Sequence, residues 1–178
     1  MRVARKDELV LDHRIDRKTF RHYLLGSPHV LHCHHYATLY CQLAEDCEML
    51  DGKRLLAEAA EDSFFQVLTD YFQEQNVEDV ADRISIAEQY YAAVGLGKME
   101  VKCAGPESGE VELVCSHVDQ GWIKKWGHHS QPVNFITWGY IAALFAAVFG
   151  RSPRAFSVLE TASIVSGAER SRFEILVN

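Results

Sequence analysis

Apolar residues recur at two different spacings along the chain, and each spacing predicts one kind of secondary structure. Spacings of three and four are typical of helices with one buried face. They predict helices over about 27–50, 54–75, 78–94 and 133–149. A spacing of two, which is typical of half-buried strands, predicts strands near 99–103, 111–115, 155–165 and 171–177.

The order of these elements predicts the fold class. Three helices precede two strands, one helix follows, and two strands end the chain, in the order ααα-ββ-α-ββ. Because no strand alternates regularly with a helix, the pattern favours an α+β protein with helices packed on a small antiparallel sheet. The length of 178 residues fits one domain over 1–178.

The first helix is expected to begin at Ser27-Pro28, where serine can cap and proline suits the first turn. It carries two apolar stripes, which predict a central helix. One stripe contains Cys33, Ala37, Tyr40, Ala44 and Cys47, and the other contains Leu31, His35, Leu39 and Leu43.

Two further helices carry specific expectations. The segment 135–149 is apolar but shorter than the roughly 20 residues of a membrane span, so it predicts a buried helix and no span. On helix 54–75, the pairs Phe64-Phe65 and Tyr71-Phe72 cannot all face one core, which predicts a homodimer. Glu58 and Glu61 are interpreted as part of an acidic helix surface.

Charge and composition exclude several classes of protein. A net charge of −7, from 25 acidic and 18 basic residues, opposes binding to nucleic acid. The first 16 residues lack the apolar segment of a secretory signal, and five cysteines form no CxxC motif. These features predict a cytoplasmic protein with reduced thiols. No motif of the GxGxxG, P-loop, GxSxG or HExxH type occurs, so whether the protein is an enzyme stays open.

The last 60 residues resemble a known family. The resemblance rests on these positions: His117, Trp122, Pro132-Val133-Asn134, Gly139, Gly150, Glu160, Ser163, Gly167, Ser171 and Phe173. They are similar to the 4-vinyl reductase domain, also called the hydrocarbon-binding domain, which is related in fold to small TRAPP subunits. The family includes bacteriochlorophyll-pathway proteins and sensors of phenol and xylene. The resemblance implies a domain that binds or senses a hydrophobic or aromatic small molecule.

The resemblance also implies a position for a zinc site. In the sensor members, three cysteines and a glutamate hold the ion, and Asn134, Glu160, Ser163 and Ser171 occupy those positions here. Amides and hydroxyls are poor substitutes for thiolates, so no zinc is expected at these four residues. The serine hydroxyls are expected instead to donate hydrogen bonds to Glu160.

Histidines are concentrated in the segment His29-Val30-Leu31-His32-Cys33-His34-His35-Tyr36. On a helix, His32 and His35 share a face, and His117 follows the second predicted strand in the inward phase. These three residues are tentative ligands of a transition metal, and the cluster is also a candidate haem site. The predicted ligand-binding residues are His32, His35, Tyr36, His117, Trp122, Trp126 and Phe135.

Two classes of function therefore stay open. The first is a ligand-binding or sensing module for a small apolar molecule. The second is a metal- or haem-binding enzyme, or an accessory protein for one, that uses the histidines between His29 and His35. The alternative to both classes is that the tryptophans only fill the core and the histidines are only solvated.

Overall fold

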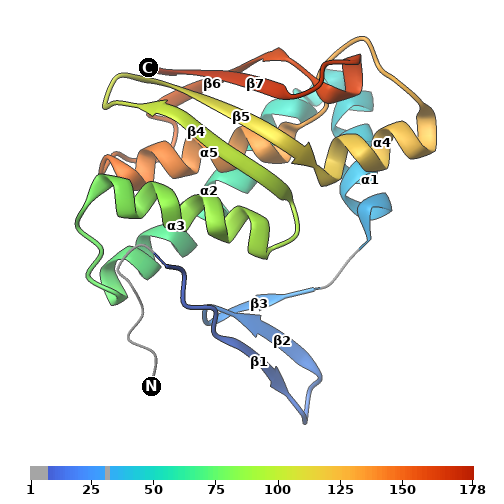
Figure 1. Cartoon of the computed structure of the whole chain (residues 1–178). Helices are drawn as coiled ribbons and strands as arrows, with labels where there is room; N and C mark the ends of the chain where they lie inside the picture. Colours follow the sequence, from blue (N-terminus) through green and yellow to red (C-terminus); the bar gives the residue numbers. More distant parts are fainter. Residues whose placement is uncertain (1–7, 31–32) are drawn as a thin grey trace.

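Two antiparallel sheets and five α-helices make up residues 8–30 and 33–178, which a computed structural model describes (Figure 1). The helices are α1 (His34–Asp46), α2 (Gly52–Glu74), α3 (Val80–Ala93), α4 (His117–Trp126) and α5 (Phe135–Val148). The strands are β1 (His13–Asp16), β2 (Arg21–Leu24), β3 (Ser27–His29), β4 (Gly97–Ala104), β5 (Ser108–Ser116), β6 (Phe156–Ala162) and β7 (Ser171–Val177). Short 3-10 turns lie at Glu48–Leu50 and Ile164–Ser166.

The larger sheet has the order β4-β5-β7-β6, with every neighbouring pair antiparallel. The hairpin and the two C-terminal strands come from the period-two segments, and their inward residues Met99, Val111, Leu113, Phe173 and Ile175 are buried. Helices α2, α3 and α5 lie on one side of this sheet (Figure 1). The α+β class and the antiparallel sheet covered by helices are therefore confirmed.

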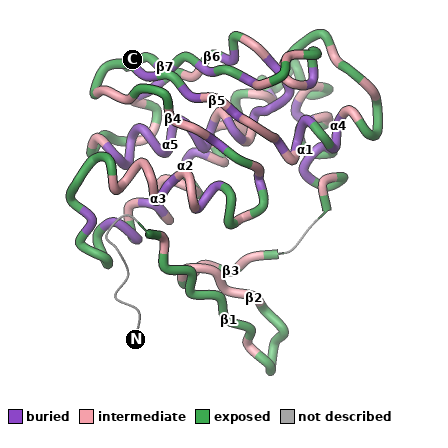
Figure 2. Tube along the Cα trace, viewed as in Figure 1, coloured by how far each residue is buried: buried purple, intermediate pink, exposed green. Residues whose placement is uncertain are grey.

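Helix α5 forms the centre of the core, as predicted for the apolar segment 135–149. Its residues from Gly139 to Val148 are all buried, and it packs on α2 and β6 (Figure 2). Two of its hydroxyl groups have partners: Tyr140 donates to the carbonyl of Ala87 at 2.6 Å, and the Thr137 and Tyr91 hydroxyls lie 2.9 Å apart. None of the helices in the described part of the chain has the length and apolar character that crossing a membrane requires.

The small sheet β1-β2-β3 was not predicted, and the predicted start of the first helix at Ser27-Pro28 is wrong. Ser27 to His29 form strand β3, at the edge of this sheet, where proline is tolerated because one side of the strand has no partner. Leu25 and Gly26, both with positive φ, connect β2 and β3 in a two-residue turn. Helix α1 begins only at His34.

Helix α1 is peripheral, so the predicted central position is also wrong. Ala37, Cys41 and Ala44 are buried against α4 and α2, but the second stripe is exposed at Leu39 and Leu43. Residues His117–Trp126 form α4, a helix that was not predicted. His117 thus lies in the first turn of a helix and not in a strand.

The aromatic pairs of α2 are accommodated within one chain. Tyr71 and Phe72 are buried, and Phe64 and Phe65 are half-buried against the same core. These aromatic pairs therefore do not support a dimer formed through α2. The exposed apolar row lies on α1 instead and contains Tyr36, Leu39, Tyr40 and Leu43. The homodimer stays a prediction.

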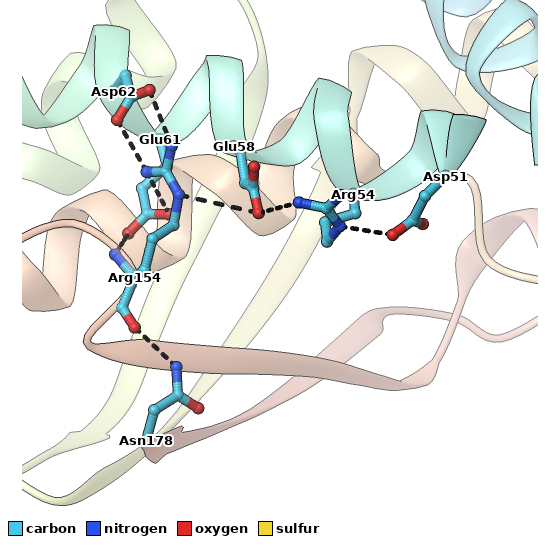
Figure 3. A network of polar contacts seen from close by, with 7 residues as sticks. All are labelled: Asp51, Arg54, Glu58, Glu61, Asp62, Arg154 and Asn178. Carbon is cyan, nitrogen blue, oxygen red and sulfur yellow. Dashed lines mark hydrogen bonds and ion pairs between the residues drawn. The ribbon is translucent and has the colours of Figure 1, made fainter.

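An ion-pair network joins α2 to the loop before β6 (Figure 3). The guanidinium of Arg154 contacts Glu61 at 3.0 Å and Asp62 at 2.8 Å, and the Arg154 backbone N–H donates to Glu61 at 2.7 Å. Asn178 donates to the Arg154 carbonyl at 2.8 Å, which ties the chain end to the same loop. Glu61 is only 4% exposed, so the interpretation of this residue as acidic surface is wrong.

Candidate functional site

A pocket of about 450 Å³ lies between the small sheet and the body of the protein, where α3 ends and α4 begins. Its apolar lining comprises Leu11, Leu24, Val30, Ala93, Val94 and Leu96, with Gly95 between them. Its polar side chains are four imidazoles, those of His13, His22, His29 and His117. The size and the mixture of apolar wall and few polar groups are typical of small-molecule sites.

Three of these imidazoles come from neighbouring strands and form what we call the histidine row: His13 on β1, His22 on β2 and His29 on β3. His22 is directly paired with His29, and His13 is paired with Leu24, two residues from His22. Because side chains alternate along a strand, all of them project from one face of the small sheet. The rings of His13 and His22 are stacked with centroids 5.4 Å apart.

Hydrogen bonds and apolar contacts hold the small sheet against the helices. The backbone N–H of Val10 donates to the Tyr71 hydroxyl at 2.8 Å, and that of Leu9 donates to the Gln89 side chain at 3.0 Å. Leu24 and Leu25 pack against the main core. His29 Nε2 lies 3.4 Å from the Tyr90 hydroxyl of α3. The pocket is therefore formed by two segments far apart in sequence.

The opposite wall is fixed by the junction of β5 and α4. Ser116 caps α4 by accepting from the Asp119 backbone N–H, and the His117 backbone N–H donates to the Leu96 carbonyl at 2.9 Å. Gly97 permits this close approach, since it has φ of 134° and a Cβ there would lie 2.2 Å from the Cys115 carbonyl oxygen. Leu96 and His117 are thereby held side by side on the pocket wall.

His34 is the α1 residue that approaches His117, whereas the sequence predicts this role for His32 and His35. The His34 ring lies edge-to-face with His117 at 5.9 Å and contacts His35 at 4.3 Å. Its Nε2 is shielded from solvent and has no hydrogen-bond partner. Burial, followed by the nearby His35 and Lys124, lowers the pKa of His34, so its neutral form is favoured.

The other predicted residues of the histidine segment lie as follows. His35 and Tyr36 are exposed on α1 and do not line the pocket, whereas His117 does; His32 lies outside the described residues. Within residues 8–30 and 33–178, no group of three or more His, Cys, Asp or Glu side chains is arranged to hold a metal ion. The metal-binding role of His32, His35 and His117 stays a prediction.

The predicted aromatic residues lie away from this pocket. Trp122 and Phe135 are buried in a second apolar cluster between α1, α4 and α5. Trp126 is 40% exposed and lies beneath the Lys125 ammonium group. None of the three appears among the pocket's lining residues. Their ligand-binding role stays a prediction.

The four residues that the resemblance relates to a zinc site lie together, with Asp119 among them. Asn134 Nδ2 donates to Asp119 Oδ2 at 2.8 Å and to Glu160 Oε1 at 3.1 Å, while its Oδ1 accepts from Ser116 at 3.0 Å. Trp138 Nε1 donates to Glu160 Oε2 at 2.8 Å. The hydroxyl of Ser171 faces Asp119 at 3.4 Å and not Glu160, in contrast to our expectation.

This donor set does not fit zinc. Asn134 presents its NH₂ group to Asp119 Oδ2 and Glu160 Oε1, which disfavours a cation at these two oxygens, and none of Asn134, Glu160, Ser163 and Ser171 supplies a thiolate or an imidazole. Its two buried carboxyl groups make the network a candidate for coupling to protonation instead. Burial raises the pKa of Glu160 to about 7 and also raises that of Asp119, against the opposing effect of their hydrogen-bond donors.

Asp119 was not predicted as part of a site, although the sequence marks its position. Ser116-x-x-Asp119 has the spacing of a helix-capping pair, which identifies the start of α4 and places Asp119 in its first turn. The pocket histidines His13 and His22 gave only a compositional signal. Both residues lie on polar strands of four residues, which are too short for an alternation of apolar and polar residues to be recognised.

Known proteins are similar to this chain in structure and not in sequence. No protein-family description and no curated protein matches the sequence. The crystal structure of the phenol-responsive sensory domain of the transcription activator PoxR with phenol has a TM-score of 0.77 and 14% identity, and the alignment covers 93% of this chain and 84% of that one. Trafficking protein particle complex subunit 3 from Naegleria fowleri, covalently bound to palmitic acid, has a TM-score of 0.54 and 11% identity over 80% of this chain and 90% of that one. At such identities these likenesses show a shared fold.

Proposed function

We propose that this protein binds or senses a small, largely apolar molecule in the pocket lined by the histidine row, His117, Leu24 and Leu96. The observation that carries the proposal is the composition of that pocket. A continuous apolar wall can desolvate a hydrocarbon or aromatic body, and the imidazoles can hydrogen-bond one polar group.

The fold comparisons support the same class of function. One similar structure is a sensory domain solved with phenol, and another carries palmitic acid. Both ligands combine an apolar body with one polar end, which is the chemistry that this pocket suits. We propose further that the chain is a 4-vinyl reductase-type domain that lacks the cysteine zinc site, in keeping with the resemblance of its last 60 residues.

The test is direct titration of small ligands into the purified protein. Isothermal titration calorimetry with phenol, indole, 4-phenylbutanamide and 4-phenylbutanoate is expected to detect saturable binding of at least one compound. The substitution Ala93→Trp places a large side chain in the pocket and is expected to abolish binding. Ala92→Trp is the matched control, because Ala92 is also exposed near the end of α3 but does not line the pocket. Equal binding by the two variants would contradict the proposed site.

A further inference from the structure

We infer that the ligand of this pocket carries a carboxylate, which the paired imidazoles of His13 and His22 recognise by taking up a proton. This inference rests on the proposed function and specifies its ligand class. The starting observation is that the described pocket lining contains four imidazoles and no carboxylate, lysine or arginine. Any positive charge that forms on the imidazoles therefore lacks a counter-charge from the lining residues.

The hydrogen bonds of His29 define its role. Its Nδ1 lies 3.0 Å from the Ser27 carbonyl oxygen, which can only accept, so Nδ1 carries the hydrogen. In the neutral ring Nε2 then accepts from the Tyr90 hydroxyl at 3.4 Å. Burial raises the pKa of Tyr90 to about 12, which keeps that hydroxyl protonated. Both nitrogens of His29 therefore have protein partners, and His29 orients the row without needing the ligand.

His13 and His22 form a pair that shares one hydrogen. His13 Nε2 and His22 Nδ1 lie 3.2 Å apart, so one nitrogen donates and the other accepts. In the neutral pair, one outer nitrogen is a donor and the other outer nitrogen is an acceptor. Addition of one proton makes both outer nitrogens donors and preserves the central hydrogen bond, whereas a second proton would break it. The pair can thus hold one positive charge in this geometry.

A carboxylate is the group that best uses this property. Imidazole changes its charge between pH 5 and pH 8, and an anion placed beside it favours the charged form. Hydrogen bonds between an imidazolium and a carboxylate are stronger than those of a neutral pair. A carboxylic acid is ionised at pH 7 and supplies the missing counter-charge, whereas a phenol, with an ordinary pKa near 10, stays neutral. The proton taken up by the pair comes from solvent.

Among residues 8–30 and 33–178, few other titratable groups face these imidazoles. His117 lines the opposite wall, His34 of α1 lies against His117, and Tyr90 of α3 lies against His29. The lining segment from Ala93 to Leu96 contributes no titratable side chain. Along β1, Leu11 and His13 line this pocket, while Asp12 and Arg14 line a separate hollow. The alternation of the strand thus keeps both charged residues out of the site.

The experiment compares 4-phenylbutanoate with 4-phenylbutanamide, which have the same apolar body and differ in charge. At pH 6.5 we expect the carboxylate to bind at least about tenfold more tightly. Titration in two buffers of different ionisation enthalpy should show uptake of about one proton for the carboxylate at pH 7.5 and none for the amide. The double substitution His13→Gln/His22→Gln keeps hydrogen-bonding groups but cannot take up the proton, so the ratio of affinities should fall toward 1.

His128→Gln is the matched control, because this imidazole contacts the Val165 carbonyl away from the pocket, and it should keep the full preference for the carboxylate. Circular dichroism establishes that each variant is folded. Equal affinity for the two compounds, or binding of the carboxylate without proton uptake, would overturn the inference and leave the proposed function in place. If neither these two compounds nor phenol and indole bind, both the inference and the proposed function fail.

Discussion

The substitution Glu160→Gln tests the interpretation that the buried network of Asn134, Asp119 and Glu160 is coupled to protonation. The perturbation replaces a buried carboxyl group by a neutral amide of similar shape. Burial raises the pKa of Glu160 from an ordinary value of 4.5 to about 7. Between these two values the unfolded chain releases its proton while the folded protein keeps it, so the wild type loses stability as pH rises.

The size of the expected change in stability follows from these two pKa values of Glu160. At about 1.4 kcal/mol per pH unit, the wild type should lose about 2–3 kcal/mol relative to Glu160→Gln between pH 5 and pH 8. The amide also disturbs a hydrogen bond to Asn134 or Trp138, but that cost does not depend on pH. Asp119, whose pKa is also raised by burial, is present in both proteins. The informative quantity is therefore the change in the stability difference with pH.

The assay is urea unfolding at pH 5, 6, 7 and 8, followed by far-UV circular dichroism so that the contact between Glu160 and Trp138 does not affect the signal. Glu174→Gln is the control, because Glu174 is exposed on the neighbouring strand β7. The free energy of unfolding of Glu174→Gln should change with pH in the same way as that of the wild type. If the curves of Glu160→Gln and the wild type run parallel over this range, Glu160 is not proton-linked and the reasoning is refuted.

Three further predictions concern stability and assembly. Arg154→Met should lower the free energy of unfolding by about 2 kcal/mol, and the melting temperature by about 4–8 °C, because buried Glu61 loses its charged partner and keeps only the hydrogen bond from the backbone N–H of residue 154. The exposed Arg54→Met should destabilise the protein clearly less. Gly121→Ala should cost about 1–3 kcal/mol by thermal denaturation, since the new Cβ would lie within 3.0 Å of two α1 side-chain atoms. Sedimentation velocity at micromolar concentration should show a dimer that Leu43→Glu dissociates; a monomeric wild type would contradict the predicted assembly.

The parts of the fold that follow from local periodicity could be predicted from the sequence. The apolar segment that forms α5 and the alternating residues of β5 and β7 each show their burial pattern over seven or more residues. Strands β1 to β3 have only three or four residues each and are rich in histidine and arginine, so no apolar alternation marks them. Their stability depends on contacts with Tyr71 and Gln89, which lie far along the chain.

The candidate site was less predictable for the same physical reason. The pocket joins residues near His13 to residues near His117, and only the packed structure brings them together. On α1, the spacing of His32 and His35 was correct for a helix that begins at Ser27, but the helix begins at His34. That shift changes which imidazole approaches His117. The grouping of Asn134, Glu160, Ser163 and Ser171 could be predicted only from the resemblance, because no periodicity of the sequence connects these four positions.

The most direct test of the proposed pocket is to observe its imidazoles during ligand binding. Two-dimensional ¹H–¹⁵N NMR spectra of the histidine side chains, assigned through single His→Gln variants, should be recorded as 4-phenylbutanoate is added. The account predicts that signals of the histidine row and of His117 shift together with one saturation curve, while those of His128 and His129, which do not line the pocket, stay unchanged. Saturable binding with no change in the four pocket imidazoles would contradict it.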